Sequence, residues 1–86
     1  MATTYILQLS NGQYYVGSTE DMNRRLREHQ EGRDSHTRKY LPVVLLYREE
    51  FPTKEEAWAR EKQLHGWSRA KKEALVKGDI DFLTRK

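Results

Sequence analysis

Two short apolar segments separated by an Asn-Gly pair open the chain. Residues 4–9 and 13–18 are rich in tyrosine and aliphatic side chains, and the pair between them is Asn11-Gly12. Asn-Gly flanked by two such runs is the strongest local signal for a β-hairpin. We therefore expect both segments to be strands joined by a tight turn.

The length of this turn decides which side chains share a face of the hairpin. A two-residue loop puts Tyr5 and Tyr15 on opposite faces. A three-residue loop over 10–12, with Gly12 in the left-handed position of a bulge, pairs Tyr5 with Gly17 and puts both tyrosines on one face. The sequence leaves the two registers open.

A helix is predicted over residues 18–32, capped by Ser18 or Thr19. At 3.6 residues per turn its apolar stripe also contains Arg25 and His29. The ordinary interpretation is that Arg25 extends along the edge of the core and that His29 is a satisfied buried imidazole. A functional role for Arg25 and His29 would require other polar residues at the same site.

The rest of the chain predicts one strand and two helices. The polar, basic segment 33–41 is typical of a surface loop, and the apolar run 42–47 is typical of a strand buried on both faces. A capping box opens a helix over 53–65, and a second helix is predicted over 68–78, between a serine cap and a glycine. The tail 79–83 is expected to form one apolar turn.

Glu61 stands out in the helix predicted over 53–65. By angular position it lies among Ala57, Trp58 and Leu64, on the apolar stripe. A carboxylate there is costly unless it is paired, protonated or bound to a metal. For Trp58 and Trp67 we expect core packing rather than stacking on bases.

Composition narrows the class of protein. The 86 residues suffice for a single domain, 1–86, and no apolar run is long enough to cross a membrane. The N-terminus lacks a secretory signal, so we expect a cytoplasmic protein without a membrane partner. The chain has no cysteine, which excludes disulfides and Cys-ligated zinc, so any metal must bind through oxygen or imidazole.

Charge placement suggests a polyanionic partner. The formal net charge is +3, with basic residues gathered at 33–39 and 69–72 and acidic residues at 49–50 and 55–56. Such clusters are the footprint of phosphate contacts, although a solvated charged surface looks the same in sequence. The candidate nucleic-acid contacts in these clusters are Arg38, Lys39, Arg69, Lys71 and Lys72.

Most common catalytic patterns are missing from the chain. It has no cysteine nucleophile, glycine-rich phosphate loop, metal-spaced histidine pair or nucleophile elbow, and we expect no small-molecule cofactor. The polar residues that remain can be given roles in phosphodiester hydrolysis, which needs an activated water, positive charge and a stabilised leaving group. They are Tyr5, Tyr15, Arg25, His29 and Glu61.

In this order the residues resemble the motif of the GIY-YIG nuclease superfamily, or URI domain. Thr3-Thr4-Tyr5 stands in the place of the first triplet and Tyr15-Val16-Gly17 in that of the second, and Arg25, His29 and Glu61 follow. The resemblance covers nearly the whole chain. Its length is similar to that of the small stand-alone bacterial members, which consist of this domain alone.

The resemblance implies an α+β fold in which helices flank a three-stranded, mostly antiparallel sheet. It also implies metal-dependent cleavage of DNA in one step, without a covalent intermediate. Tyr5 or Tyr15 would be the general base or would orient the water, with His29 as a possible proton relay. Arg25 would stabilise the phosphate, and Glu61 would hold one Mg²⁺ or Mn²⁺ ion.

The chain also departs from the family pattern, and this leaves alternatives open. Thr3 replaces a glycine, Val16 an isoleucine, and Ser18 stands where some members carry a lysine that could accept a proton. The leading hypothesis is a metal-dependent DNA endonuclease. The alternatives are a non-catalytic nucleic-acid-binding module that keeps the fold and, third, a protein-interacting scaffold.

Overall fold

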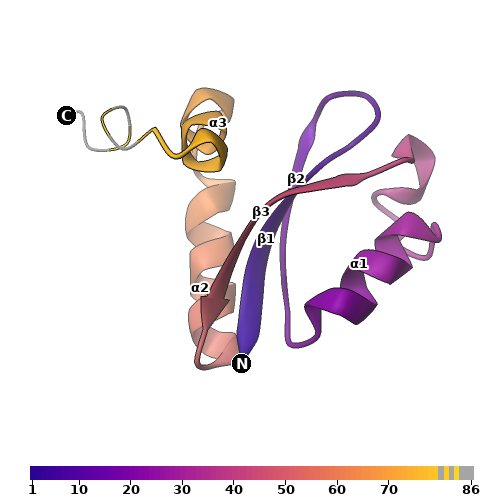
Figure 1. The fold of residues 1–86 in the computed structure, drawn as a ribbon, viewed down its shortest axis with the longest axis horizontal. Coiled ribbons are helices and arrows are strands. Elements are labelled where there is room, and N and C mark those ends of the chain that lie inside the picture. The colour runs from indigo at the N-terminus through magenta and orange to yellow at the C-terminus, as the bar shows by residue number, and fades with distance from the viewer. Residues whose placement is uncertain (80, 82, 84–86) are drawn as a thin grey trace.

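In this computed structural model, residues 1–79 form three strands and three α-helices. A short 3-10 helix lies between the first α-helix and the third strand. The structure describes residues 1–79, 81 and 83. The expected turn at 79–83 includes residues 80 and 82, which lie outside the described residues. The elements are β1 (Ala2–Gln8), β2 (Tyr14–Thr19), α1 (Met22–Gln30), η1 (Arg38–Tyr40), β3 (Val44–Phe51), α2 (Lys54–His65) and α3 (Arg69–Lys77) (Figure 1).

The strands form one sheet in the order β2-β1-β3, and both strand pairs are antiparallel. Helix α1 covers one face of the sheet, and α2 covers the other (Figure 1). Tyr5 and Leu7 of β1 pack on the α1 side, whereas Ile6 packs against Leu64 of α2. The predicted α+β architecture is confirmed.

The hairpin has the bulged, three-residue turn. Leu9 N donates to Gln13 O at 2.9 Å, which leaves residues 10–12 as the loop. Within it Gly12 has φ 87°, in the left-handed region that glycine favours. The register pairs Tyr5 with Gly17, so the two tyrosines share the face covered by α1.

Helix α1 begins later than predicted. Its N-cap is Asp21, whose carboxylate accepts a hydrogen bond from the backbone N–H of Arg24 at 3.1 Å. Ser18 and Thr19, the two expected caps, continue β2 and pair with β1. Both residues can cap, but sheet pairing already uses their backbone.

The two later helices begin and end close to their predicted bounds. Thr53 caps α2 and Ser68 caps α3, each accepting a hydrogen bond from a backbone N–H three residues further on. The helices are followed by Gly66 and Gly78. The predicted capping residues therefore stand at the observed boundaries.

Strand β3 corrects another expectation. The run 42–47 predicts a strand buried on both faces, yet β3 spans Val44–Phe51, lies at the edge of the sheet and leaves Val44 54% exposed. The doubly buried strand is β1, in which residues 2–7 are all buried. This difference arises from the order of the strands, because β1 is the central strand, with a strand on each side and a helix over each face.

The prediction that Trp58 packs in the core is wrong, since its side chain is 56% exposed. Ala57 and Leu64 lie seven residues apart, face the sheet and are fully buried. Trp58 is rotated by about 100° from Ala57 around the helix and therefore faces solvent. Trp67 is partly buried against the core on this side of the sheet.

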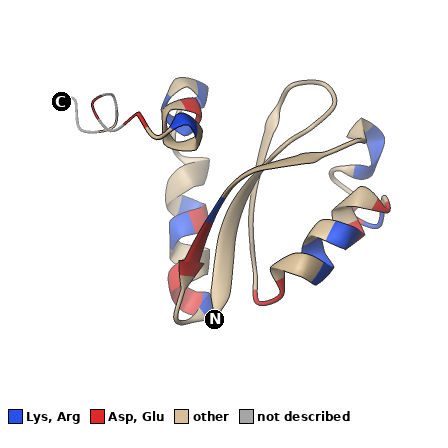
Figure 2. Ribbon diagram, in the orientation of Figure 1, with Lys and Arg blue, Asp and Glu red and all other residues tan. Residues whose placement is uncertain are grey.

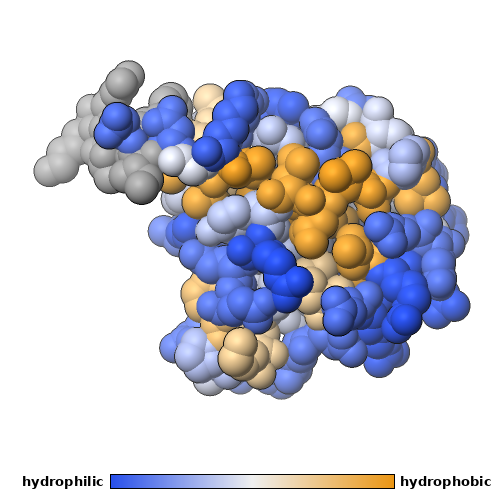
Figure 3. All heavy atoms as spheres, viewed as in Figure 1, coloured by the Kyte–Doolittle hydropathy of each residue, from blue (hydrophilic) through white to orange (hydrophobic). Residues whose placement is uncertain are grey.

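Charged and apolar side chains are segregated on the surface. Acidic residues gather where the end of β3 meets the start of α2 (Figure 2). On the face shown in Figure 3, an apolar band crosses the molecule over β3. Within the described part of the chain, no helix combines the length and apolar character needed to span a membrane.

Candidate active site

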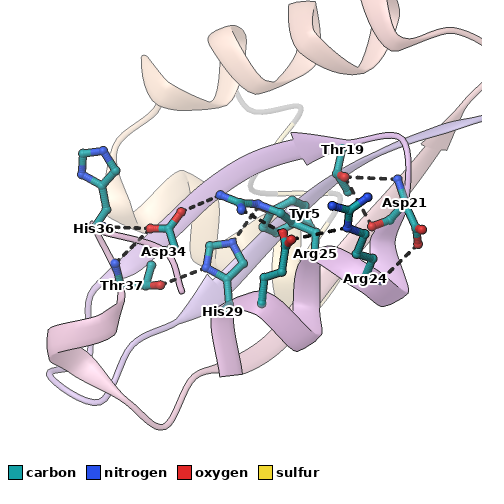
Figure 4. A network of polar contacts seen from close by, with 10 residues as sticks. Tyr5, Thr19, Asp21, Arg24, Arg25, His29, Asp34, His36 and Thr37 are labelled. Atoms are coloured by element: carbon teal, nitrogen blue, oxygen red, sulfur yellow. Dashed lines mark hydrogen bonds and ion pairs between the residues drawn. The ribbon is translucent and has the colours of Figure 1, made fainter. Parts of the chain in front are cut away.

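Four of the predicted side chains meet on the α1 side of the sheet, and we call Tyr5, Tyr15, Arg25 and His29 the tyrosine cluster. Figure 4 shows three of them, Tyr5, Arg25 and His29. Tyr5 Oη lies 3.0 Å from His29 Nε2. The ring centroids of Tyr15 and His29 are 5.3 Å apart in an edge-to-face arrangement. The hairpin register supplies both phenols, and the helical spacing of Arg25 and His29 turns both toward them.

Gly17 allows Tyr5 to take this position. The two residues are opposite each other in the pairing of β1 and β2. A Cβ atom at position 17 would lie 2.5 Å from Tyr5 Oη and 2.6 Å from its Cζ, far inside normal contact distance. The glycine of the Tyr-Val-Gly triplet is therefore required by the close approach of a ring rather than by its own backbone conformation.

Arg25 is fixed by two carboxylates and is still reachable from solvent. Its Nη2 lies 2.5 Å from Asp34 Oδ2, and its Nη1 lies 3.2 Å from Glu28 Oε1. The arginine side chain is 31% exposed, and a surface cavity of about 290 Å³ opens beside it. A guanidinium in this state can contact an incoming anion.

Asp34 and Thr37 also contact the cluster, and neither was predicted as a site residue. Asp34 Oδ1 accepts hydrogen bonds from the backbone N–H groups of His36 at 2.8 Å and Thr37 at 3.1 Å. Thr37 Oγ1 lies 2.9 Å from His29 Nδ1 (Figure 4). Both side chains are buried, so part of the predicted surface loop folds onto the cluster. An aspartate that can bond backbone N–H groups two and three residues later is the signal that could have indicated this turn.

Burial keeps both phenols of the cluster protonated. It raises the pKa of Tyr5 to about 12, although the adjacent Arg25 guanidinium acts in the opposite direction. Burial, followed by the negative charge of Asp34, raises the pKa of Tyr15 as well. Tyr5 is 1% exposed, whereas Tyr15 is only partly buried. Of the two tyrosines, Tyr15 is therefore the more exposed.

The other ionisable groups of the cluster are held in defined charge states. Burial, then the charge of Arg25, lowers the pKa of His29, which favours the neutral imidazole. Burial alone would raise the pKa of Asp34, but the N–H groups of His36 and Thr37 and the neighbouring positive charge of Arg25 together lower this pKa below its usual value. The pair of Arg25 and Asp34 is therefore ionised beside a neutral histidine.

Glu61 belongs to α2, which covers the face of the sheet opposite to the one that carries the tyrosine cluster. Its Oε1 accepts a hydrogen bond from Ser18 Oγ at 2.6 Å, and its Oε2 lies 3.2 Å from His65 Nε2. The side chain is 22% exposed, so it sits at the border of the apolar face of α2 and not in the middle of it. After burial and nearer charges, Glu61 still contributes to the raised pKa of Tyr15.

Ser18 and His65 were not predicted as partners of Glu61. The four-residue spacing of Glu61 and His65 on one helix could have indicated their contact. The contact with Ser18 depends on how α2 packs across β2, which the sequence does not specify.

The predicted basic contacts lie at the hairpin end of the molecule. Arg69 of α3 donates from Nη1 to Gly12 O at 2.8 Å. On the other side, Ser10 N donates to Tyr40 O at 2.8 Å, which joins η1 to the same turn. Arg38 and Lys39 of η1 are exposed. The remaining basic candidates, Lys71 and Lys72, are on α3 and partly buried.

Comparison with known proteins identifies the family of the chain. The family model of the GIY-YIG catalytic domain matches residues 1–74. A UPF0213 protein of Halobacterium salinarum is 43% identical over 76 residues, which cover 87% of this chain and 99% of that protein. Among solved structures, the solution NMR structure of a UPF0213 protein from Bacillus halodurans is 39% identical, with a TM-score of 0.59, and the match covers 90% of this chain and 84% of that one.

A second solution NMR structure, of a protein from E. faecalis, has a TM-score of 0.60 and 30% identity, and the match covers 98% of this chain and 88% of that one. The family model, the relatives and the solved structures all span most of the chain, and the three-stranded sheet with its flanking helices agrees with them. The chain therefore belongs to the GIY-YIG family.

Proposed function

We propose that this protein is a divalent-metal-dependent endonuclease that hydrolyses DNA phosphodiester bonds by direct attack of water. Family membership supports a nuclease-type function. The observation that carries the proposal is the tyrosine cluster itself, in which two phenols, a guanidinium and a neutral imidazole lie together.

In this proposal Arg25 binds the scissile phosphate. Its two carboxylate contacts fix the side chain before substrate arrives, so little ordering is needed at the moment of reaction. The developing negative charge on the phosphate oxygens then meets a preoriented cation.

We assign the attacking water to Tyr15 and a supporting role to Tyr5. With a pKa of about 12, Tyr5 carries almost no phenolate at neutral pH, and its buried hydroxyl faces His29. The hydroxyl of Tyr15, the more exposed tyrosine, can orient a water molecule against phosphorus. Tyr5 and His29 then hold the Tyr15 ring in place through the ring contacts between them.

Glu61 is the proposed protein ligand of the metal ion. Among residues 1–79, 81 and 83, no group of three or more His, Cys, Asp or Glu side chains is arranged to hold a metal. One partly exposed carboxylate fits Mg²⁺ or Mn²⁺, because such ions keep several waters in their coordination shell. When bound, the ion supplies positive charge that stabilises the leaving oxygen.

The test is cleavage of supercoiled and branched DNA by purified protein with Mg²⁺, Mn²⁺ or a chelator. We expect metal-dependent cleavage that falls roughly 100-fold or more in Arg25→Ala, as when other enzymes lose one preorganised donor. Glu61→Gln should lose the metal-dependent activity. The matched controls are Arg27→Ala on the exposed side of α1 and Glu56→Gln on α2, and both should cleave like the wild type.

Other outcomes separate the alternatives. Cleavage that survives both Arg25→Ala and Glu61→Gln would refute the assigned site. Salt-sensitive DNA binding without any nicking would instead support a non-catalytic nucleic-acid-binding module. If the protein neither cleaved nor bound DNA, the result would support a protein-interacting scaffold.

A further inference from the structure

The contacts of Glu61 point to a second protein ligand in the metal site. Glu61 and His65 are one turn apart on α2, and their side chains converge, with Oε2 and Nε2 at 3.2 Å. His65 is 54% exposed and Glu61 22%, so solvent reaches both groups. Two ligating side chains at four-residue spacing on a helix are a common way to present a divalent ion with two donors.

The hydroxyl of Ser18 bonds one carboxylate oxygen of Glu61 and leaves the other oxygen available to a metal ion. It donates to Oε1 at 2.6 Å, which fixes the carboxylate and directs Oε2 toward the imidazole. A ligating carboxylate whose other oxygen is hydrogen-bonded is a usual feature of metal sites.

The separation of the two donor atoms suits two adjacent ligands of one ion. At metal–ligand distances of about 2.0–2.2 Å, neighbouring positions of an octahedron are roughly 3 Å apart. The observed 3.2 Å between Nε2 and Oε2 is close to this spacing. Small side-chain rotations on an exposed helix surface would let both lone pairs face the ion.

We propose that Glu61 and His65 bind the divalent ion together, with Ser18 as the positioning residue. This inference rests on the proposed function for the role of the ion, but not for the existence of the site. An imidazole donor shifts preference away from Mg²⁺, which favours oxygen ligands, and toward Mn²⁺ and later transition ions. The site is thus selective for Mn²⁺ over Mg²⁺.

The experiment measures metal binding directly, without DNA. The wild type, His65→Ala and Glu61→Gln are titrated separately with Mn²⁺ and Mg²⁺ at mildly alkaline pH. Binding is followed by calorimetry and by paramagnetic broadening of histidine side-chain resonances. His36→Ala is the matched control, because His36 is an exposed histidine outside the proposed site.

We expect Mn²⁺ to broaden the resonances of His65 before those of His36. His65→Ala should lower the affinity for Mn²⁺ about tenfold or more and that for Mg²⁺ less than about threefold, because only Mn²⁺ gains much from an imidazole. Glu61→Gln should weaken binding of both ions. His36→Ala should change neither affinity.

Two results would overturn the proposal. If His65→Ala lowers both affinities equally, His65 only orients Glu61. If the wild type shows no preferential broadening of His65 at millimolar Mn²⁺, the pair is not a metal site. Neither result decides whether the protein cleaves DNA, and failure to cleave DNA does not affect the binding measurement.

Discussion

At the scale of single residues, the tyrosine cluster depends on the lack of a side chain at Gly17. The Tyr5 ring occupies the space that a side chain on Gly17 would fill. Tyr5 in turn contacts His29, whose imidazole packs edge-on against Tyr15. A change at one glycine should therefore be felt through three aromatic side chains.

We predict that Gly17→Ala destabilises the protein by about 1–3 kcal/mol, the usual cost of overpacking a filled core. The added methyl would have to displace the Tyr5 ring and break its contact with His29. Urea unfolding measures the stability, and histidine ring NMR shifts report the contact.

Gly66→Ala is the control for this substitution. Its φ is −83°, and a new Cβ would lie 3.5 Å from Gln63 O, which is an ordinary contact. Its stability should stay within about 1 kcal/mol of the wild type. If both substitutions had the same effect, the close approach at Gly17 would not be the cause.

At the scale of elements, the segment between α1 and η1 connects the cluster to the rest of the chain. Asp34 forms the turn through two backbone N–H groups and also pairs with Arg25. These are different interactions, one of hydrogen bonding and one of charge. They can be separated by substitution.

We predict that Asp34→Ala is less stable than Asp34→Asn by about 1–2 kcal/mol. Asparagine keeps an oxygen for the two N–H groups, whereas alanine leaves them unsatisfied beside the core. Both variants remove the negative charge that helps to raise the pKa of Tyr15, so the pKa of this phenol should fall in each. Urea unfolding and NMR titration of ring-labelled tyrosine measure the two effects.

An equal loss of stability in the two variants would show that the turn bonds contribute little. An unchanged pKa of Tyr15 would contradict the electrostatic role of Asp34. A purely structural effect would alter stability without moving this pKa.

The elements differ in how far their sequence determines them. The presence of the hairpin, the caps of α2 and α3 and the stripe carrying Arg25 and His29 follow from local chemistry, whereas the sequence leaves the register of the hairpin open. The position of β3 in the sheet does not follow from its sequence, because a run of apolar residues can form either a central strand or an edge strand. Asp34, Thr37 and Ser18 acquire their roles only when distant segments pack together.

At the scale of the whole molecule, the basic segments lie on both sides of the hairpin turn. The bond from Arg69 to Gly12 joins α3 to the turn, and that from Ser10 to Tyr40 joins η1 to it. The acidic residues of β3 and α2 gather elsewhere (Figure 2). This separation of charge favours one orientation of a polyanion.

We predict that Lys39→Gln and Lys72→Gln each weaken DNA binding and reduce the slope of log affinity against log salt by about one. Each would remove one phosphate contact and its released counterion. Binding is measured with a chelator present, so that no strand is cut. Lys54→Gln, on the acidic side beside Glu55 and Glu56, should leave the slope unchanged, and an equal change in all three variants would contradict this assignment.

The free edge of β3 has a consequence for self-association. Its first half, 44–47, is apolar and its second half contains Arg48, Glu49 and Glu50. If two copies aligned their β3 strands antiparallel, each apolar half would face the charges of the other. Parallel alignment would place identical carboxylates side by side, so the order of residues along this strand opposes growth of the sheet from one molecule into the next.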